Sequence, residues 1–184
     1  GPCVFGETWS DTDDTSVCKL VSKCGVGWGV EMAATLTSNT VCAECVSGET
    51  FNDVNDAVTA CQVVRTCGLG FGVDDYPTKH SDTVCEACVE GVTWNGEDDA
   101  TTTCLPVTKC DSGSGVETPP TTQSDTVCEA CVLGVTWNDQ NDLSECEDVT
   151  LCSSGNGVNI APTTESDTDC DPCVLGETWN DKND

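Results

Sequence analysis

Pairs of cysteines separated by two residues recur along the whole chain at nearly constant intervals. One pair, Cys85 and Cys88, lies in the segment Asp82–Trp94. Close copies of this segment occur at Asn39–Phe51, Asp125–Trp137 and Asp167–Trp179. The copies are 42 or 43 residues apart, and self-similarity at a period of this size is the signature of a repeat protein. The sequence therefore predicts repeats at 1–44, 45–87, 88–130 and 131–172, and the start of a fifth at 173–184.

Cysteine content and aromatic content together limit what these repeats can fold into. The 184 residues include 17 cysteines, whereas only 5% are aromatic, so a repeat of this length cannot stabilise itself by burial alone. Closing a loop of about 15 residues with a disulfide contributes about 3 kcal/mol in the chain-entropy model. Disulfides persist outside the reducing cytosol. We expect an extracellular, small disulfide-rich fold: an elongated tandem array of short-strand, loop-rich repeats without helices of note.

The odd cysteine is explained by its position. Cys173 opens the last copy of the motif, and in earlier copies the next cysteine follows after 15 or 16 residues. That position lies beyond Asp184. Both ends of the chain also fall inside the motif, so we expect the sequence to be a segment of something longer.

The charge of the chain excludes two classes of partner. The formal net charge is −27, with 6 Lys and Arg against 33 Asp and Glu, which disfavours nucleic acid and anionic membranes. An acidic loop follows the aromatic residue of each repeat, and its side-chain oxygens could bind calcium, although turn formation is the favoured explanation and the EF-hand pattern is absent. The calcium candidates are Asp53, Asn55, Asp56, Asp139, Asn141 and Asp142. We predict no other cofactor.

Two further patterns predict local structure. The aromatic residue at Phe51, Trp94 and Trp137 is expected to form the core of its repeat, since a ring is the largest apolar group a small module can bury. The pattern Cys-x-x-Gly-x-Gly-Val recurs in each repeat. Because no Lys-Ser/Thr pair follows these glycines, we predict a turn with positive φ rather than a phosphate loop.

Threonine- and proline-rich tracts lie between these glycines and the fourth cysteine of the later repeats. Their composition is typical of O-glycan acceptors, and no Asn-x-Ser/Thr sequon occurs. The candidate acceptors are Thr118, Thr121, Thr122, Thr163 and Thr164.

Nothing in the sequence predicts an enzyme. Catalysis requires a base or nucleophile in a tuned environment, and the one histidine, His80, lies in a polar loop with no counterpart in other repeats. The evenly spaced cysteines also argue against a zinc site or a redox dithiol.

These motifs together resemble the cysteine-rich repeats of the tumour necrosis factor and nerve growth factor receptor family. Cys-x2-Cys spacing is also found in cysteine-rich surface antigens of protists, a weaker resemblance. The receptor resemblance implies an A module closed by the first two cysteines of each repeat and a B module after it. The implied A-module pairs are Cys3–Cys18, Cys45–Cys61, Cys88–Cys104 and Cys131–Cys146, and the B-module pairs are Cys24–Cys42, Cys67–Cys85, Cys110–Cys128 and Cys152–Cys170.

The chain departs from the family pattern in one regular way. One B-module disulfide is missing, because Val64 and Pro77, and their counterparts in other repeats, occupy the two cysteine positions. The resemblance then implies a small apolar contact in place of the bridge.

The uniformity of the repeats guides the functional prediction. Near-identical copies without a distinctive loop favour a non-catalytic segment of a long extracellular rod or filament, such as a fibre, appendage or surface coat, whose partners are neighbouring repeats or copies of itself. The alternatives are a receptor or surface-antigen ectodomain that binds a protein ligand, and a calcium-dependent adhesion module.

Overall fold

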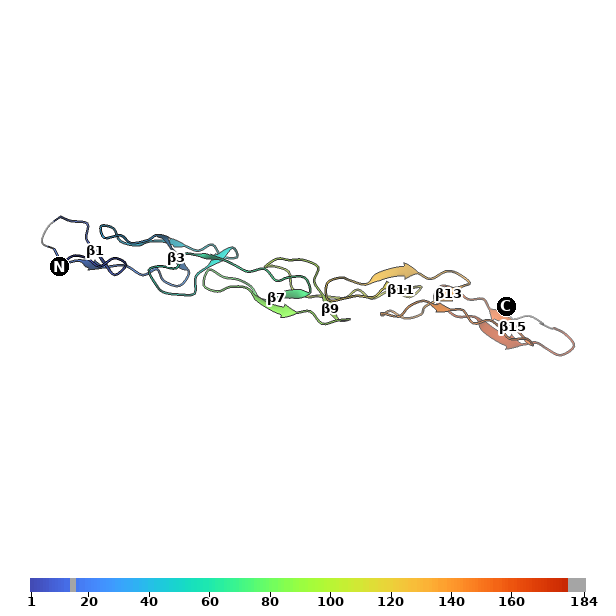
Figure 1. Ribbon diagram of the computed structural model, residues 1–184. Coiled ribbons are helices and arrows are strands. Elements are labelled where there is room, and N and C mark those ends of the chain that lie inside the picture. The colour runs from blue at the N-terminus through green and yellow to red at the C-terminus, as the bar shows by residue number, and fades with distance from the viewer. Residues whose placement is uncertain (14–15, 179–184) are drawn as a thin grey trace. The chain divides into compact units, whose positions relative to one another are not determined.

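The computed structural model describes residues 1–13 and 16–178. Within these ranges the chain forms sixteen short strands, paired into eight two-stranded antiparallel sheets, and no helix (Figure 1). Consequently none of the described segments is a helix that could cross a bilayer. The prediction of a small disulfide-rich fold of short strands and loops is confirmed.

Each repeat contains two hairpins of different size. The first pairs two-residue strands: β1 (Thr8–Trp9) with β2 (Lys19–Leu20), β5 (Thr50–Phe51) with β6 (Gln62–Val63), β9 (Thr93–Trp94) with β10 (Leu105–Pro106), and β13 (Thr136–Trp137) with β14 (Glu147–Asp148). The second pairs five residues with four: β3 (Trp28–Met32) with β4 (Val41–Glu44), β7 (Phe71–Asp75) with β8 (Val84–Ala87), β11 (Ser114–Thr118) with β12 (Val127–Ala130), and β15 (Asn156–Ile160) with β16 (Asp169–Pro172). Each larger hairpin carries a β-bulge in its first strand, as between Val30 and Met32.

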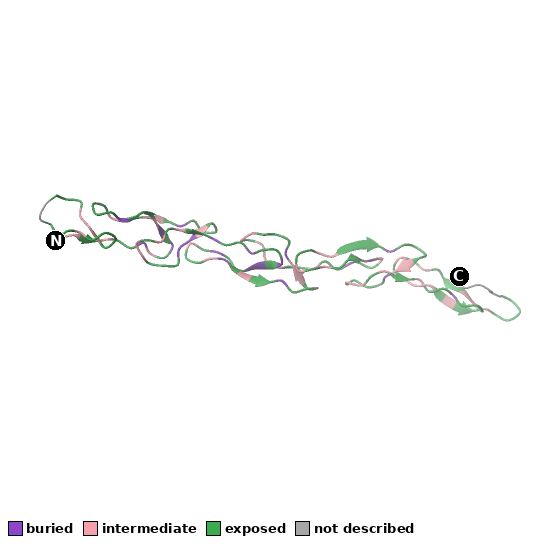
Figure 2. Cartoon of the chain, viewed as in Figure 1, coloured by how far each residue is buried: buried purple, intermediate pink, exposed green. Residues whose placement is uncertain are grey.

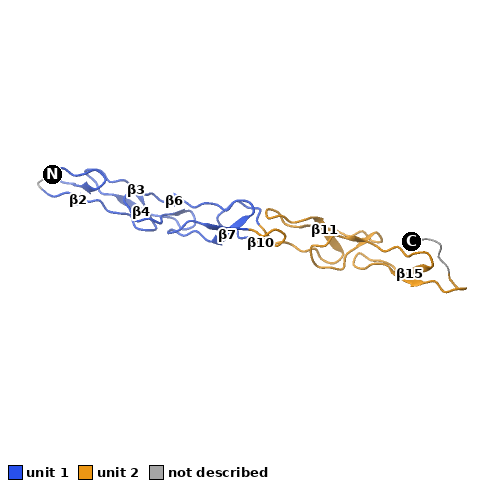
Figure 3. Ribbon diagram, turned by 60° about the horizontal axis from the view of Figure 1, so that its bottom comes forward, with its two compact units in different colours: residues 1–87, 95–104 blue, residues 88–94, 105–184 orange. Residues whose placement is uncertain are grey.

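The chain divides into two compact units, each described here by itself (Figure 3). Unit 1 comprises residues 1–87 and 95–104, and unit 2 comprises residues 88–94 and 105–184. The acidic loop of repeat 3 therefore groups with the repeat that precedes it. Contacts between consecutive repeats can be followed within unit 1 for repeats 1 and 2, and within unit 2 for repeats 3 and 4.

Buried residues form only short stretches along the chain (Figure 2). Cysteines and asparagines, rather than aromatic residues, are the most frequent among them. The third cysteine of every repeat is 1% exposed. Asn52 and Asn95, which directly follow the aromatic residue, are 0% and 1% exposed. The prediction that the ring is the core holds for Phe51, which is buried, but is wrong for Trp94 and Trp137, which are half-buried.

The two glycines of the Gly-x-Gly pattern serve different purposes. Gly27 has φ +81°, as predicted for a turn. Gly29 does not have positive φ, but a Cβ there would lie 2.1 Å from the backbone nitrogen of Cys61 in the next repeat. The second glycine is therefore required because two consecutive repeats approach too closely for any side chain.

Hydrogen bonds reinforce the B module where the family disulfide is missing. Val64 and Pro77, which occupy the cysteine positions, are both buried. Beside them, Oδ1 of Asp82 accepts hydrogen bonds from the backbone amides of Arg65 and Thr83, each at 2.8 Å. The Asp of the Ser-Asp-Thr motif thus closes the loop that a second disulfide would otherwise close.

Candidate ligand-binding surface

The structure brings together the cysteines that the family resemblance pairs. Seven disulfides are defined: Cys3–Cys18, Cys24–Cys42, Cys45–Cys61, Cys67–Cys85, Cys110–Cys128, Cys131–Cys146 and Cys152–Cys170. Cys88 and Cys104 are also disulfide-bonded. Cys173 is a free, half-buried thiol. All cysteines other than Cys173 therefore belong to one covalent framework.

A buried asparagine joins each repeat to the one before it. The Nδ2 of Asn52 donates to the carbonyl oxygen of Trp28 at 2.6 Å, and its own backbone carbonyl accepts a hydrogen bond from the Gly27 amide at 2.7 Å. Within its own loop, Oδ1 of Asn52 accepts from the Val54 amide at 3.1 Å. Asn95 and Asn138 make the corresponding bonds. Sequence analysis missed this role, because asparagine in a polar loop also fits an exposed turn.

A four-residue turn at the tip of each larger hairpin folds back toward the joint. In repeat 2 it spans Thr78–Ser81: the Thr78 amide donates to the Ser81 carbonyl at 3.1 Å, and the Thr78 hydroxyl accepts from the His80 amide at 3.1 Å. The Lys79 carbonyl accepts a hydrogen bond from the Asn52 amide at 3.1 Å. The turn therefore fixes the position of its two central side chains relative to the preceding repeat.

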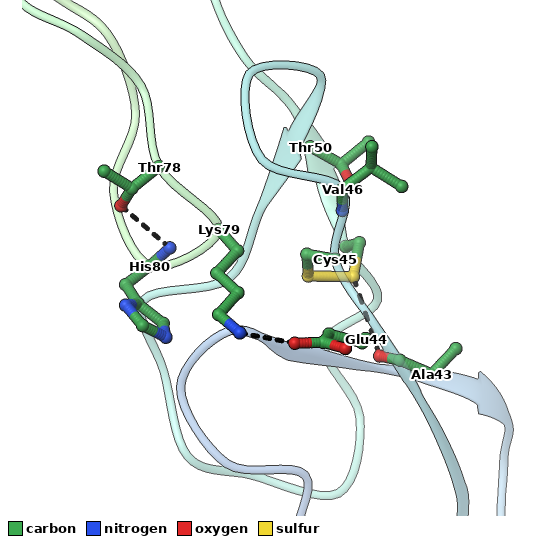
Figure 4. A network of polar contacts seen from close by, with 9 residues as sticks. Ala43, Glu44, Cys45, Val46, Thr50, Thr78, Lys79 and His80 are labelled. Carbon is green, nitrogen blue, oxygen red and sulfur yellow. Dashed lines mark hydrogen bonds and ion pairs between the residues drawn. A yellow bond between two sulfur atoms is a disulfide. The ribbon is translucent and has the colours of Figure 1, made fainter.

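These central side chains reach repeat 1 (Figure 4). The ammonium of Lys79 pairs with the carboxylate of Glu44 at the end of β4. The His80 ring covers Gly27, where a Cβ would lie 2.4 Å from the ring carbon Cδ2. The one histidine of the chain thus packs against the preceding repeat from an exposed turn.

The frame of the turn is constant, but the pair of central residues is different in every repeat. Thr and Ser stand at its ends in all four copies, at Thr35–Ser38, Thr78–Ser81, Thr121–Ser124 and Thr163–Ser166, with the same amide-to-carbonyl hydrogen bond. The central residues are Leu36-Thr37, Lys79-His80, Thr122-Gln123 and Thr164-Glu165. The repeats therefore do carry a distinctive loop, which the sequence prediction of uniform copies overlooked.

The residue between the two glycines also varies, and it faces solvent in unit 1. Trp28 is 43% exposed and Phe71 is 47% exposed. The equivalent positions in unit 2 are Ser114 and Asn156. Large aromatic residues at exposed positions are typical of protein-binding surfaces, where they serve as anchors.

The acidic loops use their carboxylates to hold their own backbone. Both oxygens of Asp56 accept hydrogen bonds from Thr59, from the hydroxyl at 2.7 Å and from the amide at 2.8 Å, and Val58 adds a third donor. These bonds lower the pKa of Asp56, and the same arrangement lowers the pKa of Asp99 to about 2. The carbonyl of Asp56 also accepts from the Cys24 amide at 2.6 Å.

The calcium candidates are therefore divided between two environments. Asp56 and Asp142 are half-buried and engaged in turn hydrogen bonds, with Oδ1 of Asp142 accepting from the Ser144 amide at 2.7 Å. The other four candidates are exposed: Asp53, Asn55, Asp139 and Asn141. Across residues 1–13 and 16–178, no three His, Cys, Asp or Glu side chains gather in a way that could hold a metal ion.

The candidate glycan acceptors likewise differ in their surroundings. The hydroxyls of Thr121 and Thr163 bond to Ser124 and Ser166 at 2.8 Å inside the turn, where a sugar would displace them. Thr122 and Thr164, the first central residues of their turns, are both half-buried. Thr118, at the end of β11, is exposed and has no such turn contact among the hydrogen bonds of the described residues. Of the five, Thr118 is the one that is exposed and lies outside the turns.

The repeats are similar to the cysteine-rich repeats of known proteins. Residues 88–128 match the family model of the TNFR/NGFR cysteine-rich region. A chain of the human RANKL/OPG complex is 24% identical, with 91% of this chain and 99% of that chain covered and a TM-score of 0.42. A chain of the mouse RANKL-OPG complex is also 24% identical, covering 73% and 96%, with a TM-score of 0.33. No curated protein matches the sequence.

These findings correct the functional prediction. The matched model describes a receptor's cysteine-rich region, so the prediction of a structural rod or filament is wrong. The predicted partners, copies of the chain in a fibre, are wrong for the same reason. The resemblance itself is confirmed. The chain is an array of disulfide-rich repeats, of which residues 88–128 match the TNFR/NGFR cysteine-rich region.

Proposed function

We propose that this chain is part of the ectodomain of a cell-surface receptor or surface antigen, that it binds a protein ligand, and that it is not an enzyme. The observation that carries the proposal is the match of residues 88–128 to the TNFR/NGFR cysteine-rich region. The disulfide framework suits the extracellular environment that such a role requires.

The distribution of constant and variable residues supports a binding role. Residues that build the repeat, such as the joint asparagines and the two glycines, are the same in each complete joint. Residues that face solvent differ, as Trp28 and Phe71 do from Ser114 and Asn156. A protein that only spaces its neighbours has no use for aromatic side chains held in water, since exposing them costs free energy.

Charge defines the kind of ligand. With a net charge of −27, the chain attracts proteins that present a basic surface and repels acidic ones. We therefore expect the ligand to combine apolar groups, which cover Trp28 and Phe71, with lysine or arginine around them. Association is expected to slow as salt concentration rises.

The proposal is tested by screening the oxidised chain against an array of extracellular proteins and measuring affinities by surface plasmon resonance. We expect saturable one-to-one binding that weakens about 30-fold in Trp28→Ser or Phe71→Asn, because losing an interface anchor costs about 2 kcal/mol. Ser114→Ala is the matched control and leaves the affinity unchanged. Saturable binding that neither aromatic substitution weakens would contradict the proposed surface, and an array without any binding protein would contradict the function.

A further inference from the structure

Repeat 1 shows how an acidic loop of this chain binds an ammonium group. Trp9 and Lys19 are cross-strand partners in the β1–β2 hairpin. The Lys19 Nζ lies 4.8 Å from the centroid of the Trp9 ring and 3.0 Å from Oδ1 of Asp11, two residues after the tryptophan. The ammonium is thus held between an indole face and a carboxylate, which is a favourable cation–π arrangement.

Repeat 4 contains the same two acceptors without the lysine. Trp137 occupies the position of Trp9, and Asp139 follows it by two residues as Asp11 does. The cross-strand partner of Trp137 is Glu147, where repeat 1 has Lys19. Repeat 4 therefore replaces the internal cation by a second carboxylate.

A hollow of about 510 Å³ lies at this position in unit 2. Trp137, Asp139, Asp142 and Glu147 are among the residues that line it. The three ion pairs of the described ranges, Lys19–Asp11, Arg65–Asp82 and Lys79–Glu44, all belong to unit 1. The pKa of Asp142 is lowered first by the hydrogen bonds from Ser144 and then by the charge of Lys109. Neither Asp139 nor Glu147 takes part in any of these ion pairs.

The other repeats lack this combination. In repeat 2 the pair is Phe51 and Gln62, and in repeat 3 it is Trp94 and Leu105, with Gly96 in place of the aspartate. A metal ion is also a poor occupant of the hollow, because the described residues offer no group of three metal ligands. An indole ring also has no oxygen atom with which to bind a hard cation. An organic ammonium gains from both the ring and the carboxylates.

We propose that the hollow formed by Trp137, Asp139 and Glu147 is a recognition pocket for a lysine side chain of the protein ligand. This inference rests on the proposed function for the identity of the partner, but not for the chemistry of the pocket. The lysine occupies the place that Lys19 takes in repeat 1, with its ammonium over the Trp137 ring and between the two carboxylates.

The pocket is tested by NMR on the oxidised chain with ¹⁵N-labelled tryptophan. The probe is Nα-acetyl-lysine-N-methylamide, and its Nε-acetylated derivative, which has no charge, is the matched control. We expect a saturable shift of the Trp137 indole signal, assigned with Trp137→Phe, with the charged probe and none with the neutral one. Equal shifts with both probes, or no shift of Trp137, would overturn the proposal.

Reciprocal substitutions make the test sharper. Glu147→Lys supplies the cation internally, so the indole signal should move without probe and probe affinity should fall at least about tenfold. Glu145→Lys makes the same change of charge two residues away and should lower the affinity less than about threefold. Lys19→Glu should create probe binding at Trp9. Glu147→Gln tests the same carboxylate should the lysine variant fail to fold. Equal losses of probe affinity in Glu147→Lys and Glu145→Lys would show that only the overall negative charge attracts the probe, and would overturn the pocket.

The outcomes separate this inference from the proposed function. A probe titration needs no protein ligand, so its failure rejects the pocket and leaves the receptor proposal standing. Conversely, if the chain binds the probe but no extracellular protein, the pocket proposal stands and the proposed function is rejected. A protein ligand whose affinity is the same for the wild type and Glu147→Lys also overturns the inference.

Discussion

Replacing Asn52 by alanine should loosen the joint between repeats 1 and 2 while leaving the disulfides intact. Its side chain is fully buried and satisfies two backbone groups, the Trp28 carbonyl at 2.6 Å and the Val54 amide at 3.1 Å. A buried group left without its hydrogen bond costs about 1–3 kcal/mol. Because Val54 is exposed and water can reach its side of the loop, we expect a total loss of about 2–4 kcal/mol.

Amide hydrogen exchange measures this loss locally, which is necessary because repeat arrays do not unfold as one two-state unit. The Cys24 and Gly27 amides donate to carbonyls of the Asn52 loop. Their protection should fall about 30- to 700-fold in Asn52→Ala, from the tenfold change per 1.4 kcal/mol. The exposed neighbour Asp53 provides the control variant, Asp53→Ala, which should leave protection unchanged. Unchanged protection in Asn52→Ala as well would refute the role of the asparagine.

Three further predictions follow from single contacts. Gly29→Ala should prevent native packing of repeat 1 against repeat 2, because its Cβ would lie 2.1 Å from a backbone atom. Gly25→Ala, which has open space around its Cβ, should fold normally. Non-reducing peptide mapping distinguishes the two variants by their disulfide pairing. Hydrogen bonds from the Thr101 amide and from Thr102 lower the pKa of Asp99 from 3.8 to about 2. Since its folded-state pKa is the lower one, this carboxylate stabilises the fold above about pH 4 and loses that effect as the pH falls toward 2. Circular dichroism from pH 2 to 5 should therefore show a weaker acid transition in Asp99→Asn, and an unchanged transition would reject the assignment. We also predict an O-linked sugar on Thr118 in native material, which an intact mass equal to the bare oxidised chain would exclude.

The covalent framework was predictable from the sequence because its signals are local and repeated. The spacing of cysteines indicated the repeat and its length, and the resemblance supplied the pairing. Turn glycines such as Gly27 were also predictable, since positive φ is a property of one residue and its neighbours. The loop role of Asp56 was favoured over calcium for the same local reason.

The contacts between repeats were not predictable by the same reasoning. Asn52 is hydrogen-bonded to the carbonyl of Trp28, a residue 24 positions earlier in the chain, so no local pattern marks it as core. Ring size instead predicts that the aromatic residue before each joint asparagine forms the core, yet only Phe51 is buried, and Trp94 and Trp137 are half-buried. The proposed binding surface could not be predicted from what the repeats share, because Trp28 and Phe71 are residues in which the repeats differ.

Photo-crosslinking in the native setting tests most directly whether the chain binds a protein ligand. Trp28 or Phe71 is replaced by p-benzoylphenylalanine in the full-length protein, the sample is irradiated, and the adducts are identified by mass spectrometry. Ser114, at the equivalent position of repeat 3, is substituted in the same way as the control. We expect a single adduct with a different, basic extracellular protein from Trp28 and Phe71, and little from Ser114. Adducts consisting only of two copies of this chain would contradict the account.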